Sequence, residues 1–142
     1  MYSLLRYSLA FATLITVFSC SHNRREEVVE DSRPVIWPDY REVTVPVNIA
    51  PLNFTVEQPA FLSPGKNAFS RLEATVEGAD GSTMKGSGKQ VVRFSPRRWK
   101  QLLEKNAGDS LRVTVRSLEG KQWHRYRPFV IYVSDRPIDH GL

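Results

Sequence analysis

The sequence predicts a mainly β protein, an immunoglobulin-like antiparallel β-sandwich with one short helix, in residues 37–142. Apolar and polar residues alternate with period two in several short segments, which is typical of antiparallel sheets with one solvated face. Clusters of glycine and polar residues separate these segments, as turns separate the strands of a sandwich. The chain has 142 residues, which is long enough for one domain with a hydrophobic core.

Six segments with strand-like patterns are spread over the predicted sandwich. Their ranges are 42–47, 52–57, 70–78, 89–95, 110–118 and 122–134. The clearest alternation lies in 110–118, where Leu111, Val113 and Val115 face one side and polar residues face the other. Turns are expected at 63–67, 78–82, 85–89 and 119–121. About seven short strands over roughly 100 residues suit an immunoglobulin-like sandwich.

A single helix is expected between two of these strands. Ser95 is a candidate N-cap, and Pro96 suits the first helical turn because no backbone N–H is needed there. The apolar residues that share one face of this helix are Trp99, Leu102 and Leu103. Asn106 and Gly108 are typical of a helix C-terminus. We therefore expect Trp99 to anchor the helix on the sandwich.

Residues 1–19 have the three parts of a secretion signal. Arg6 and the amino terminus form a weakly positive start, an apolar run of 11 residues follows at 8–18, and Ser19 is a small residue at its end. The run is shorter than the roughly 20 residues that a membrane-spanning helix needs. A signal peptide is therefore predicted, with a transmembrane anchor or a buried N-terminal helix as the alternative.

The chain has one cysteine, Cys20, directly after this signal. The segment 17–20, Val-Phe-Ser-Cys, resembles the lipobox of bacterial lipoproteins, although Phe18 stands where Ala or Ser is commoner. The resemblance implies that Cys20 is lipidated at sulfur, becomes the new N-terminus and holds the protein on a membrane; the alternative is a free cysteine in an ordinary signal peptide. Residues 20–36 are polar, charged and without periodicity, which predicts a disordered tether behind the lipidated cysteine.

Three segments of the predicted domain carry a second resemblance. Residues 37–54, 95–103 and 126–139 are similar to the N-terminal region of TolB-like propeller lipoproteins of Bacteroidota. The resemblance implies a front domain of structural type, which in that family is followed by a β-propeller. This sequence ends at 142, so we expect either a lone version of the front domain or a truncated gene product.

Basic and aromatic residues gather around the last predicted hairpin. The candidate partner-binding face consists of Arg112, Arg116, Trp123, Arg125 and Arg127. Like charges directly opposite one another in a sheet are destabilising, so this face needs nearby acids or an anionic partner. Glu73 and Glu77 are the acids that a neighbouring strand offers. Two interpretations stay open: a solvated sheet face, and a face that contacts anions or glycans.

No catalytic, metal or cofactor site is predicted. Residues 80–90 look superficially like a phosphate loop, but Thr83 stands where the motif needs glycine and Gln90 replaces Ser or Thr, so a flexible hairpin is expected. The three histidines lie far apart in sequence and lack metal-ligand spacing; they are His22, His124 and His140. His124 is expected to be a surface or half-buried strand residue. The segment Asp109-Ser110-Leu111 resembles the O-glycosylation site of Bacteroidota, which makes Ser110 a candidate for that modification.

The predicted location in the cell envelope restricts which classes of function are expected. The net charge of +5 would suit nucleic acid or anionic lipid, but an exported lipoprotein rarely meets nucleic acid. We therefore expect a lipid-anchored protein of the bacterial cell envelope, at the outer membrane, that acts as a non-enzymatic binding or scaffold module for an envelope protein or glycan. Two alternatives stay open: a truncated, non-functional front domain, and an envelope enzyme whose site the sequence does not reveal.

Overall fold

The structure of the chain is a computed structural model that describes residues 26–58 and 68–139. In chain order the elements are β1 (Glu27–Val29), β2 (Ile36–Trp37), β3 (Thr44–Pro46), β4 (Phe54–Val56), β5 (Phe69–Gly78), β6 (Thr83–Gly88), β7 (Val91–Val92), α1 (Pro96–Lys105), β8 (Ser110–Glu119), β9 (Gln122–Arg125) and β10 (Phe129–Ser134). The strands form one seven-stranded and one three-stranded sheet. The mainly β class and the helix are confirmed, and the fold is sandwich-like with open sheets; the immunoglobulin-like arrangement stays a prediction.

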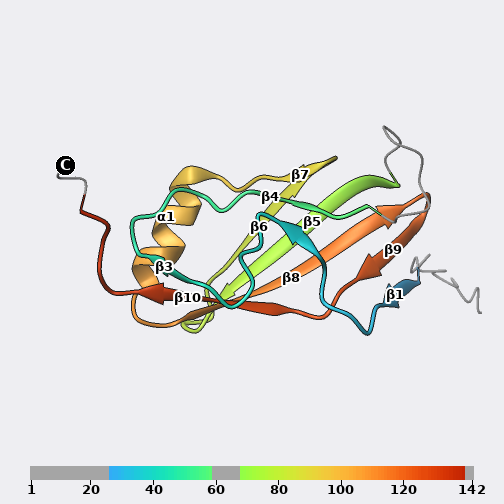
Figure 1. The fold of residues 1–142 in the computed structure, drawn as a ribbon. Helices are drawn as coiled ribbons and strands as arrows, with labels where there is room; N and C mark the ends of the chain where they lie inside the picture. Colours follow the sequence, from blue (N-terminus) through green and yellow to red (C-terminus); the bar gives the residue numbers. More distant parts are fainter. Residues whose placement is uncertain (1–25, 59–67, 140–142) are drawn as a thin grey trace, which may run out of the picture.

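The two longest strands, β5 and β8, form the centre of the seven-stranded sheet (Figure 1). They pair antiparallel from Phe69 opposite Glu119 to Gly78 opposite Leu111, with one irregularity near the start of β5. Along β8 the inward side chains are fully buried and the outward ones are exposed or half-buried, as the period-two pattern predicts. The helix lies at one end of these strands, and β9 with β1 lies at the other (Figure 1).

The second edge of β8 is shared by two strands. β10 pairs antiparallel with Ser110–Val113, and β9 pairs antiparallel with Arg116–Glu119. The prediction of one strand over 122–134 is therefore wrong, because the chain leaves the sheet between Arg125 and Phe129. Pro128 lies in this break, and a proline cannot donate the backbone hydrogen bond that a continuous strand would need there.

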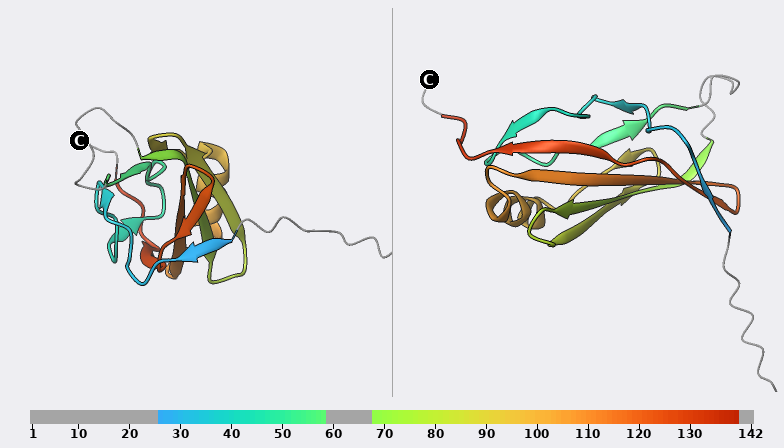
Figure 2. Two further views of the ribbon diagram at one scale, coloured as in Figure 1. Left: turned by 90° about the vertical axis from the view of Figure 1, so that its right-hand side faces the viewer. Right: turned by 90° about the horizontal axis from the view of Figure 1, so that it is seen from below.

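Two N-terminal strands extend this sheet in parallel. β3 pairs with β10 and β1 pairs with β9, both in parallel register, so the prediction of purely antiparallel pairing is wrong for these two pairs, whereas β6 at the opposite edge pairs antiparallel with β5. The prediction of a disordered tether over 20–36 also fails for residues 27–36, which contain β1 and the start of β2. Opposite charges on β1 and β9 hold this segment, as described below. Figure 2 (left) shows β1 in blue beside β9 in red.

The three-stranded sheet, in the order β2-β4-β7, contributes the other side of the core. Phe54 on β4 packs against Phe129 of the large sheet and Phe94 after β7, with ring centroids 6.4 Å and 6.2 Å apart. The predicted strands 42–47, 52–57 and 89–95 are present but shorter, as β3, β4 and β7. The turn predicted at 63–67 lies outside the described residues.

The strand β6 was missed by the sequence analysis. Residues 85–89 were expected to form a turn in a flexible hairpin, but Thr83–Gly88 pair with β5. Met84 and Gly86 face inward in this strand while their neighbours are exposed. A Cβ on Gly86 would lie 2.5 Å from Cδ1 of Phe94, so glycine is required for the phenyl ring to pack here. The glycines therefore report close packing instead of a turn.

The helix begins and ends as predicted, with Pro96 in its first turn and Asn106 as C-cap, although Ser95 makes no side-chain capping bond. Trp99 is 1% exposed, its ring centroid lies 5.3 Å from that of Phe94, and its indole N–H donates to the Ile49 carbonyl at 3.2 Å. The predicted role of Trp99 as the helix anchor is confirmed.

Candidate binding face

The structure brings three of the five predicted face residues into contact. Arg116 on β8 lies directly opposite Arg125 on β9, and both project to the solvent side of the sheet. The guanidinium carbon of Arg116 lies 4.2 Å from the centroid of the Trp123 ring, which is within the range of a cation–π contact. The like charges of Arg116 and Arg125 therefore lie side by side on the last hairpin, as the sequence predicts.

Acidic side chains of the same protein compensate these two arginines. Glu73 on β5 lies opposite Arg116, and its Oε2 accepts from Nε at 2.9 Å and from Nη2 at 2.6 Å. On β1, Oε1 of Glu27 lies 3.7 Å from Nη1 of Arg116, and Oε2 of Glu27 lies 3.7 Å from Nε of Arg125. Glu73 was predicted as a compensating acid. Glu27 was missed, because residues 20–36 were assigned to the tether.

The other two arginines also lie beside acids. Arg127 follows β9, and its Nη2 lies 2.8 Å from Oδ1 of Asp31. Arg112 is exposed and sits opposite Glu77 in the register of β5 and β8. This face is a mixed-charge surface whose arginines have acidic neighbours within the chain, so an anionic partner would have to compete with these acids.

A group of polar side chains occupies the opposite side of β8 and β9. Ser117 is fully buried and its hydroxyl lies 3.3 Å from the Tyr126 hydroxyl. His124, directly across from Ser117, is half-buried as expected, and its Nδ1 lies 2.6 Å from Oε1 of Glu30. Burial raises the pKa of Tyr126 above its ordinary value of 10.0, and the carboxylates of Glu119 and Glu30 act in the same direction.

This polar group does not have the geometry of a nucleophilic relay. A serine nucleophile needs an exposed hydroxyl within hydrogen-bond reach of a base. Ser117 is fully buried and its hydroxyl contacts the Tyr126 phenol, while Nδ1 of His124 lies beside Glu30 and Nε2 lies 3.9 Å from Glu119, so the imidazole is paired with two acids and not with the serine. These contacts join β8 and β9 to Tyr126 and to Glu30, the residue after β1.

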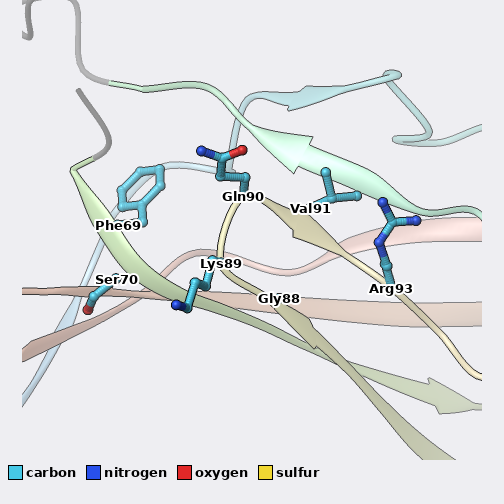
Figure 3. Close-up of a pocket in the computed structure, with 7 residues that line it drawn as sticks. All are labelled: Phe69, Ser70, Gly88, Lys89, Gln90, Val91 and Arg93. Carbon is cyan, nitrogen blue, oxygen red and sulfur yellow. The ribbon is translucent and has the colours of Figure 1, made fainter. Parts of the chain in front are cut away.

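The three-stranded sheet presents an exposed tryptophan that the sequence analysis did not single out. Trp37 on β2 is 75% exposed. It lies opposite Thr55 on β4, which lies opposite Val91 on β7, so these side chains form a row across the outer face. Figure 3 shows Val91 and Arg93 on the same side of β7, where they line a shallow hollow. The sequence shows that a tryptophan is at position 37, but the exposure of its side chain follows from the register in which β2 pairs with β4.

The remaining predicted sites are placed as follows. Cys20 and the signal peptide lie outside the described residues. Ser110 begins β8 and is half-buried, and its backbone N–H donates to Oδ1 of Asp109 at 2.9 Å; its glycosylation stays a prediction. Within residues 26–58 and 68–139, no group of three or more His, Cys, Asp or Glu could hold a metal ion. No helix in this part of the chain has the length and apolar character needed to cross a bilayer.

Comparisons with known protein families, with curated proteins and with solved structures find no match to this chain. The resemblance to propeller lipoproteins therefore stays a prediction from the sequence.

Proposed function

We propose that the chain is a lipid-anchored protein of the bacterial cell envelope that acts as a non-enzymatic binding module, and that the face around Trp37 contacts an envelope glycan. The observation that carries this proposal is the exposure of Trp37, which leaves three quarters of the residue in water. An indole ring is large and apolar on its faces, so leaving it exposed forgoes burial that most tryptophans obtain.

The neighbours of Trp37 favour a sugar over an apolar protein surface. The row continues through Thr55, which offers a hydroxyl, to Val91, and Arg93, two residues further along the chain on the same side (Figure 3), adds a donor. A sugar ring has one face of C–H groups that packs on an indole and a rim of hydroxyls that need polar partners. The outer face of the β2-β4-β7 sheet offers both kinds of group within a shallow surface.

The proposed membrane location depends on lipidation of Cys20, and the length of the segment behind Cys20 limits how far the domain lies from the membrane. Six residues, 21–26, lie between Cys20 and the start of β1 at Glu27, so the seven Cα steps from Cys20 to Glu27 span at most roughly 25 Å when fully extended. A lipidated Cys20 would hold the β1 and β9 end of the domain close to the membrane. This tether is much shorter than the one predicted from the sequence.

Binding to isolated envelope glycans tests the partner. Wild type should bind purified peptidoglycan sacculi or soluble envelope polysaccharides, and Trp37→Ala should bind about tenfold more weakly or worse, as expected for a central aromatic contact. Tyr132→Ala is the matched control, because Tyr132 is an exposed aromatic residue on the other sheet. Equal binding by both variants would refute the Trp37 face. Trp37-dependent capture of an envelope protein, with no glycan bound, would reassign the partner class.

Membrane fractionation tests the anchor separately. Cys20→Ala should remain uncleaved or be released from membranes, because the lipid attachment needs the thiol. A variant that matures and fractionates like wild type would overturn the lipoprotein assignment without touching the Trp37 proposal.

A further inference from the structure

Residues 26–31, which we call the acidic strap, lie along β9 as an added parallel strand. Within the strap, Glu27–Val29 form β1, with Val28 opposite His124. The Glu30 N–H donates to the Arg125 carbonyl at 2.8 Å, and the Arg127 N–H donates to the Ser32 carbonyl at 2.9 Å. Figure 1 shows β1 beyond β9 at the outer edge of the sheet. Without the strap, β9 would be an open edge strand.

Charge complementarity holds the strap in this register. The four acids of the strap are Glu26, Glu27, Glu30 and Asp31. Three arginines and a histidine from β8, β9 and the residues after β9 face these acids. The pairs are Glu27 with Arg116 and Arg125 at 3.7 Å, Glu30 with His124 at 2.6 Å, and Asp31 with Arg127 at 2.8 Å. The edge of β9 therefore matches an extended segment rich in acids.

Apolar burial contributes little to this attachment. Val28 is 40% exposed and Val29 is 65% exposed, and neither belongs to the core. Exposed ion pairs contribute little to stability and are screened by salt. Segments with few buried apolar contacts open locally at a small fraction of the global free energy of unfolding. The strap is thus held by backbone hydrogen bonds and by charges that an ionic medium weakens.

We propose that the edge of β9 is a binding site for acidic, extended peptide segments, and that the strap is its resident ligand. Strand addition supplies affinity through the backbone, and Arg116, Arg125 and Arg127 select acids at the side-chain positions. An acidic segment of a partner protein competes with the strap for this edge. This proposal depends on the strap and not on the Trp37 face.

Peptide binding to the full chain, purified in detergent, tests this site. The probe is a labelled peptide with the sequence of residues 26–33, and the control peptide has its four acids replaced by lysine. The triple variant Glu27→Lys, Glu30→Lys and Asp31→Lys detaches the strap by charge reversal. It should bind the acidic probe about tenfold more tightly than wild type does, since the resident strap no longer competes, and binding should weaken as salt is raised.

A restoring variant controls for non-specific effects. Adding Arg125→Glu and Arg127→Glu to the triple variant makes the lysine strap complementary again, so binding of the acidic probe should be lost. The proposal is overturned if the folded triple variant binds the acidic probe no better than wild type does, or binds both peptides equally.

Hydrogen exchange of wild type provides a test that needs no variant to fold. The amide of Glu30 should exchange at least about tenfold faster than the amides of β5 and β8, and faster still in high salt. Exchange of the Glu30 amide as slow as in β8, at low and high salt alike, would show that the strap is a permanent strand and would overturn the proposal.

Discussion

The buried side chain of Asn106 should carry an unusual share of the stability for a polar residue. Asn106 is 2% exposed and caps the C-terminus of α1. Its Nδ2 donates to the Leu102 carbonyl at 2.8 Å, and its Oδ1 accepts from the Asp80 N–H at 3.2 Å. Asn106 therefore joins the helix to the turn between β5 and β6. The perturbation is Asn106→Ala, which deletes both of these backbone bonds together with a long contact from Nδ2 to the Ser82 hydroxyl at 3.4 Å.

The expected loss of stability depends on whether the Leu102 carbonyl and the Asp80 N–H find other hydrogen-bond partners in the variant. A hydrogen bond contributes about 1 kcal/mol net, but a buried group left without a partner costs roughly 1–3 kcal/mol. The bond to the Leu102 carbonyl is buried, whereas the bond from the N–H of the exposed Asp80 is part-buried, so one orphaned buried group and one lost bond predict that Asn106→Ala lowers the free energy of unfolding by about 2–4 kcal/mol. In a domain of this size that corresponds to a fall in Tm of roughly 8–16 °C.

A second asparagine offers a matched control. Asn48 is exposed, and it also makes two backbone bonds, accepting from the Ile138 N–H at 2.7 Å and donating to the Ile138 carbonyl at 3.1 Å. Water can replace both partners in Asn48→Ala, so the loss should stay below about 1 kcal/mol. Urea unfolding followed by circular dichroism measures both variants. Equal losses would refute the argument that burial, and not the number of bonds, sets the cost.

Three further changes test the core and one surface carboxyl. Trp99→Ala should lower the free energy of unfolding by about 3–5 kcal/mol, and a urea midpoint like that of wild type would show that Trp99 is not the anchor. Gly86→Ala should cost about 1–3 kcal/mol, because the new methyl group meets Phe94; Ser87→Ala, at an exposed position of the same strand, should change stability by at most about 0.5 kcal/mol. Hydrogen bonds from Ser82 lower the pKa of Asp80 below its ordinary value of 3.8. The stabilisation from Asp80 is therefore present above that value and is lost as pH falls through the folded pKa. Asp80→Asn should make stability less sensitive to acid below about pH 4, and a carboxyl that titrates at or above 3.8 in NMR spectra would contradict this.

The mainly β class, the long central strands and the helix with its anchor could be predicted from the amino-acid sequence. These features depend on local patterns: period-two alternation for β5 and β8, and the Pro96 start with an apolar stripe around Trp99 for α1. The position of Glu73 beside Arg116 was also predictable, because both lie on well-patterned strands. Where apolar residues alternate with polar ones, a shift of one residue in strand pairing would expose the apolar face, so the alternation restricts the register.

The positions of the polar segments could not be predicted from the sequence, because they depend on contacts between distant parts of the chain. The strap has no apolar periodicity, and its place on β9 depends on side-chain contacts such as that between Oε1 of Glu30 and Nδ1 of His124, which lie 94 residues apart in sequence. The glycines of β6 are typical of a turn in the sequence, whereas in the structure Gly86 leaves room for the Phe94 ring. The exposure of Trp37 likewise follows from the pairing of β2 with β4. In each case the deciding contact joins residues distant along the chain, and a local pattern carries no information about which distant segment supplies the partner.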